Sequence, residues 1–151
     1  MKKFLLLTLV ISSIYAVLKD KDKDPLHKRI FLTTITEIKN GTPSNKTASD
    51  ELEFKNNKVF SKYLNDKFNI NWMSYTITKD STFTDSITEA EVRYFEVKAL
   101  FKNQDAEETH LYCKIENEII NGEIKILKND KLKKQFEFSG QEKATKIKDK
   151  K

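Results

Sequence analysis

Residues 91–102 read EVRYFEVKALFK, and this stretch decides the fold. Apolar side chains recur at every second position, at Phe95, Val97, Ala99 and Phe101. Glu96, Lys98 and Lys102 fall on the opposite face. Successive side chains of a β-strand point to opposite faces of the sheet. The alternation therefore predicts a strand with one buried face and one face in water.

The same alternation recurs along most of the chain. Strands are expected over residues 29–39, 51–55, 58–61, 71–79, 91–102, 110–115, 122–128 and 131–139. Residues 61–68 have a weak helical period, and residues 42–50 and 80–90 are polar and predict loops. Short links join antiparallel neighbours, because a parallel crossover needs a dozen residues or more. Eight strands so spaced predict an all-β protein, either a sandwich or a closed barrel.

The first residues are typical of an export signal. Residues 1–16 read MKKFLLLTLVISSIYA, with two lysines, a short apolar run and a small residue at Ala16. This order is that of a secretory signal peptide, and the apolar run is shorter than the roughly 20 residues of a membrane span. We therefore divide the chain into a signal peptide (1–16), a charged linker (17–28), a β-barrel domain (29–142) and a Lys-rich tail (143–151). The expected location is periplasmic or extracellular.

The positive charge is unevenly distributed. The whole chain carries a net charge of +5, but residues 143–151 alone hold five lysines and one aspartate. With the two signal-peptide lysines also set aside, residues 17–142 are left near −1. No specific nucleic-acid surface is expected on such a body. The tail offers weak contact with anionic surfaces, and its deletion should leave stability nearly unchanged.

The composition offers little for catalysis. The chain has 1 Cys, 2 His and 3 Gly, which excludes zinc motifs built on cysteine pairs and glycine-rich phosphate loops. His110 and Cys113 lie three residues apart on one expected strand, so their side chains should point to opposite faces. A nucleophile and its base must lie within hydrogen-bonding distance. We therefore expect no enzyme activity, no catalytic residue, no metal site and no cofactor.

The second half of the chain resembles a known kind of protein. Phe95-Glu96-Val97, Ile115-Glu116, Ile120 with Gly122, and Phe136-Glu137-Phe138-Ser139-Gly140 are similar to the strands that end small secreted bacterial lipocalin-like (calycin-like) barrels. The hairpin of residues 53–61 is also similar, whereas the Gly-x-Trp of true lipocalins is missing from the first strand. The resemblance implies an eight-stranded antiparallel lipocalin-like barrel, to which the weak helical period adds a short helix near residues 61–68. It implies no established activity.

The expected inner face suggests two functions. An eight-stranded barrel either fills with its own side chains or holds one small ligand. The first hypothesis is a non-enzymatic binding module that holds a small apolar or amphipathic molecule. Its expected lining consists of Phe54, Trp72, Met73, Tyr75, Phe95 and Phe101, with Tyr75 or Thr76 as polar groups near the mouth.

The alternative is a structural or protein-interaction module of the cell envelope with a solidly packed barrel. It would use its outer surface, where Tyr94, Tyr112 and Leu127 are expected to form an apolar patch. The oligomeric state is left open.

Overall fold

A computed structural model describes residues 24–144, which form eight strands and one short helix. The expected signal peptide, residues 17–23 of the linker and residues 145–151 of the tail lie outside the described residues. The elements are β1 (Ile30–Lys39), β2 (Thr42–Lys55), β3 (Lys58–Ser61), α2 (Lys62–Phe68), β4 (Met73–Thr84), β5 (Glu91–Lys102), β6 (Glu107–Glu116), β7 (Ile119–Lys128) and β8 (Lys131–Glu142).

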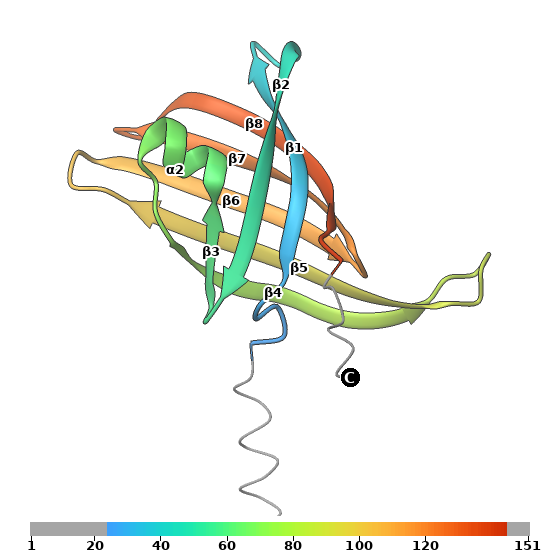
Figure 1. The fold of residues 1–151 in the computed structure, drawn as a ribbon. Helices are drawn as coiled ribbons and strands as arrows, with labels where there is room; N and C mark the ends of the chain where they lie inside the picture. Colours follow the sequence, from blue (N-terminus) through green and yellow to red (C-terminus); the bar gives the residue numbers. More distant parts are fainter. Residues whose placement is uncertain (1–23, 145–151) are drawn as a thin grey trace, which may run out of the picture.

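Every strand pairs with the next in antiparallel fashion, and β8 pairs with β1 to close the barrel. Figure 1 shows this ring, with α2 beside β3 at one end. The predicted eight-stranded antiparallel barrel and the predicted helix are both confirmed. Within the described part of the chain, no helix is long and apolar enough to cross a membrane.

Of the two segments expected to be loops, residues 42–50 are strand throughout and residues 80–90 are strand up to Thr84, with the expected loop confirmed over residues 85–90. Residues 42–50 pair with β1 across a tight turn at Asn40-Gly41, where both residues have positive φ (51° and 76°). Residues 80–84 extend β4 and pair with β5. Both predictions rested on polar side chains, but the ladder is made by backbone groups, which pair regardless of side-chain polarity. Pro43 fits in β2 because β3 pairs with β2 only from Leu52 onward.

The helix α2 closes one end of the barrel. Ser61 caps its start by accepting a hydrogen bond from the backbone N–H of Leu64 (3.0 Å). The helix ends at Asn69, whose left-handed backbone (φ 55°) is tolerated by asparagine. Leu64 is fully buried, and Tyr63 and Phe68 pack against Phe136 of β8. The helix is therefore held by its apolar side, as a helix of this length must be.

A short turn before β1 closes the other end. Residues 24–28 form this turn, and Leu26 is fully buried in the core cluster. The end of the expected linker therefore packs on the barrel. The sequence offers little sign of this, because Leu26 is a single apolar residue in a highly charged segment. His27, for which the sequence shows no partner, accepts a hydrogen bond from the backbone N–H of Asn56 through Nδ1 (3.2 Å). At the other end of the chain, Lys143 still donates a backbone hydrogen bond to Ile30 (2.7 Å).

Candidate functional site

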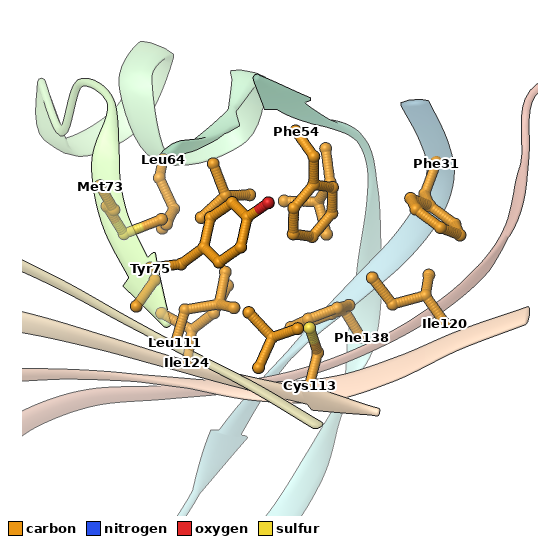
Figure 2. Packing of buried hydrophobic residues seen from close by; sticks show 14 of the residues in the cluster. Phe31, Phe54, Leu64, Met73, Tyr75, Leu111, Cys113, Ile120, Ile124 and Phe138 are labelled. Carbon is orange, nitrogen blue, oxygen red and sulfur yellow. The ribbon is translucent and has the colours of Figure 1, made fainter. Parts of the chain in front are cut away.

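Most of the predicted lining does face the barrel interior. Phe54 and Met73 are fully buried, and Phe95 and Tyr75 are 3% and 6% exposed. Phe101 is half-buried and packs against the same cluster. Figure 2 shows side chains from β2, β4, β6 and β7 meeting in one apolar space. The period of two therefore assigned these inward faces correctly.

Trp72 is the exception among the predicted lining residues. It precedes β4, is only half-buried, and stands outside the core cluster. Its ring packs against Phe60, with centroids 5.3 Å apart. Phe60 lies between the buried residues Val59 and Ser61 and therefore points outward from β3. The lining prediction is wrong for Trp72, because the alternation that brings Met73 inward turns its neighbour outward.

The interior is filled by side chains. Phe31, Phe54 and Met73 have no surface open to a water-sized probe, so no void of that size adjoins them. Phe54 packs edge-to-face between Phe31 and Tyr75, with ring centroids 5.8 and 5.4 Å apart. This is a geometry that aromatic rings favour. The structure thus has the packed-core form of the two arrangements open to an eight-stranded barrel.

Tyr75 and Thr76, the polar groups expected near the mouth, lie on opposite faces of β4. The hydroxyl of Tyr75 donates a hydrogen bond to the carboxylate of Asp24 in the N-terminal turn. Burial and this carboxylate raise the pKa of Tyr75 well above its ordinary value. Thr76 is exposed on the outer face. Tyr75 is therefore engaged within the protein and is not free to orient a ligand.

Asp50 is a buried charge that the sequence reading missed. It is 6% exposed, and its carboxylate accepts hydrogen bonds from Ser61 Oγ (2.7 Å) and from the backbone N–H groups of Tyr63 (2.8 Å) and Glu51 (2.7 Å). Burial raises its pKa despite these bonds. The two-residue alternation places Asp50 on the same inward face as Leu52 and Phe54. It was missed because the polar residues 42–50 predict a loop.

One hollow lies on the outer surface of the barrel, across β6, β7, β8 and β1. It has a volume of about 550 Å³. Its polar lining includes Tyr112, Lys114, Asn121, Glu123, Glu137 and Ser139. Directly opposed pairs bring these side chains together, with Tyr112 beside Glu123 and Glu123 beside Glu137. Side chains that oppose each other on one face of a sheet lie close enough to contact a common partner.

A second hollow of about 410 Å³ adjoins the first one. It is lined by Lys98, Ala99, His110, Leu111, Tyr112, Glu123, Lys125 and Leu127. Tyr112 and Glu123 belong to both hollows. Tyr112 therefore lies between two hollows on one continuous surface. We call this surface the Tyr112 face, and it consists of the residues named above for the two hollows.

The predicted apolar patch includes polar and charged contacts. Tyr94 and Tyr112 do point outward, but the Tyr94 hydroxyl donates a hydrogen bond to Glu96 (2.6 Å). That bond raises the pKa of Tyr94 to about 12 and lowers the pKa of Glu96. Lys79 lies over the Tyr94 ring, 5.0 Å from its centroid. Leu127 is half-buried in the second hollow, so the three residues form a mixed surface.

The two residues considered for nucleophilic chemistry are separated, as their spacing predicts. His110 is on the outer face, with Nε2 3.0 Å from Glu108. Cys113 is fully buried, and burial raises the pKa of its thiol to about 12. A thiol so shielded from water and base is a poor nucleophile. Across residues 24–144 we find no group of three His, Cys, Asp or Glu side chains arranged to hold a metal ion.

Comparisons with known proteins provide no relative for this chain. No family model, no curated protein and no solved structure matches it. The lipocalin-like resemblance remains a prediction from short motifs.

Proposed function

We propose that this protein is an exported, non-enzymatic binding module that holds a protein partner on the Tyr112 face. The observation that carries the proposal is that the barrel is filled and closed at both ends. Leu26 and Leu64, one at each end, are fully buried, whereas the two hollows around Tyr112 open to solvent. The proposal follows the expected alternative, a solidly packed interaction module.

The chemistry of the Tyr112 face suits a protein surface. Tyrosine combines a large apolar ring with a hydroxyl and is enriched at the centres of protein interfaces. Lysines and glutamates alternate around it, with Lys125 bonded to Glu123 (2.9 Å). Charges of both signs favour a partner with complementary charges of its own over a polyanion.

Site-specific photocrosslinking would test this proposal. A photoreactive phenylalanine analogue at position 112 is compared with the same analogue at Lys55, an exposed position on β2. We expect one discrete crosslinked protein from the native envelope or extracellular fraction at position 112, and a loss of that product in Glu123→Lys. Equal products at both positions, or a product unaffected by Glu123→Lys, would reject the Tyr112 face as the site.

The interior remains the second candidate site, for a small apolar or amphipathic molecule. It is favoured by the apolar lining of Phe54, Met73 and Phe95. A ligand there needs side chains to move, because their surfaces are not open to water. Native mass spectrometry separates the two candidates. The bare mass of the chain is expected if the partner binds outside, and a retained small molecule would favour the interior.

A further inference from the structure

Within residues 24–144, a small set of hydrogen bonds and one buried side chain attach the N-terminal turn to the barrel. The Asp24 carboxylate accepts hydrogen bonds from the backbone N–H groups of Leu26 (3.0 Å) and Asn57 (3.0 Å) and from the Tyr75 hydroxyl. One side chain thus joins the turn to the β2–β3 connection and to β4. We call residues 24–28 the plug, and Figure 1 shows it at the end of the barrel away from α2.

In the part of the chain that the structure describes, two backbone bonds at Lys28 and Arg29, the His27 ring and one apolar side chain add to the attachment. His27 Nδ1 accepts a hydrogen bond from the backbone N–H of Asn56 (3.2 Å). Lys28 N–H donates to the carbonyl of Phe54 (2.8 Å), and Phe54 N–H donates to the carbonyl of Arg29 (2.9 Å). Leu26 is the plug's buried apolar side chain. Among the described residues, Leu26 is therefore held in place by hydrogen bonds that join its turn to the β2–β3 connection, to Phe54 and to Tyr75. Arg29, the first residue after the plug, is anchored separately by its ion pair with Glu142 (2.6 Å).

The ring of strands is complete without the plug. β1 pairs with β2 from Ile30 and with β8 from Phe31, so releasing residues 24–28 breaks no strand-to-strand pairing. Lys28 also has a left-handed backbone (φ 69°), which is unfavourable for a residue with a side chain. Segments with few buried contacts open at lower free energy than the sheet that they cover.

From this arrangement we propose that the plug is a conformational device that opens as one unit while the eight strands stay folded. Its opening withdraws Leu26 and exposes Phe54 and Tyr75 at that end of the barrel. The Asp24 carboxylate is the latch, because it contacts the plug, the β2–β3 connection and β4 at once. This inference is independent of the Tyr112 face, and it would supply the entrance that an interior ligand needs.

Native-state hydrogen exchange of the chain from residue 17 onward tests the plug. The reporting amide is Lys28, which bonds to Phe54 and not to the latch. In the wild-type protein, the exchange rate of this amide should not depend on urea at low concentrations, because a local opening exposes little surface. The amides of Val97 and Cys113, in β5 and β6, should exchange faster as urea is added. Asp24→Ala should accelerate Lys28 exchange about tenfold or more, because several hydrogen bonds are lost together.

Two further variants control for simple destabilisation. Tyr75→Phe retains the ring and should accelerate Lys28 exchange by a smaller factor of about three to ten. Tyr94→Phe removes a comparable tyrosine–carboxylate bond, that to Glu96, from the outer face and should leave Lys28 exchange unchanged. The inference is overturned if Lys28 exchanges only with the β5 and β6 amides, or if Asp24→Ala and Tyr94→Phe have the same effect.

An apolar dye tests whether opening exposes the barrel end. N-phenyl-1-naphthylamine fluoresces in apolar surroundings, and its emission should rise several-fold more with Asp24→Ala than with wild type or Tyr94→Phe. No difference between Asp24→Ala and wild type would overturn the claimed exposure.

Discussion

The side chain of Ser61 donates a hydrogen bond to Asp50 (Oγ–Oδ2 2.7 Å) while accepting one from the backbone N–H of Leu64 (3.0 Å). Asp50 lies on β2, and Leu64 lies in the first turn of α2. The hydroxyl thus links the strand to the start of the helix, and the Asp50 carboxylate adds a second link by accepting from Tyr63 N–H. The direction in which the chain leaves β3 is fixed by this pair.

Removing the Ser61 hydroxyl should weaken the fold. Ser61→Ala deletes the helix cap and a bond to a buried carboxylate, and we expect the free energy of unfolding to fall by about 1–2 kcal/mol. Urea denaturation followed by circular dichroism measures it. Ser74→Ala, at an exposed position on β4, is the control and should be near neutral. Equal effects of the two substitutions would mean that the Ser61 contacts contribute nothing specific.

Asp50 should give a distinctive pH dependence. Its pKa is raised by burial, so between the unfolded value of about 3.9 and the higher folded value the native state binds more protons than the unfolded state. This contribution therefore favours folding at low pH and is lost as the pH rises through that interval. Asp50→Asn removes the titrating group while keeping its shape. The stability of wild type relative to Asp50→Asn should increase as the pH falls, and a constant or reversed difference would contradict the assignment.

The Cys113 thiol should be inert in the folded protein. It is fully buried and its pKa is raised to about 12, so almost no thiolate is present at pH 8. Ellman's reagent should label Cys113 only as fast as the protein unfolds, and at once in urea. His110→Cys in a Cys113→Ala background places a thiol on the outer face of the same strand and should be labelled within minutes. Rapid labelling of native wild-type Cys113 would show that this part of the barrel opens readily.

Gly140 should tolerate no side chain. A Cβ there would lie 2.1 Å from the carbonyl oxygen of Leu32 and 2.6 Å from Thr33 Cα, and these backbone atoms of β1 cannot move aside without disturbing the pairing with β8. We expect Gly140→Ala to cost about 3 kcal/mol or more in urea denaturation.

Gly41→Ala is the comparison for Gly140→Ala. Gly41 has a positive φ of 76° but no atom within 4 Å of the added Cβ. Only backbone strain remains, and the expected loss is about 1 kcal/mol. Similar losses for the two variants would mean that β1 and β8 approach less closely at Gly140 than the structure shows.

Local patterning determined the strands whose two faces differ in polarity. β5 has the limits that its alternation predicts, Glu91 and Lys102, and Cys113 is buried opposite the exposed His110. Such features depend on the two-residue period of a strand, which the sequence states directly. The first half of β2 could not be found in this way, because its side chains are polar and its position comes from backbone pairing with β1.

The sequence by itself determined an all-β chain with alternating faces, a short helix after residue 61 and a core rich in phenylalanine and isoleucine. Only the tertiary structure decided that residues 42–50 pair with β1 as a strand, which carries Asp50 inside, and that the interior is filled. It alone placed Asp24 against Tyr75, 51 residues away along the chain. The physical reason is that alternation is a property of neighbouring residues. Ring closure and the sealing of the barrel ends depend instead on which distant segments share one core.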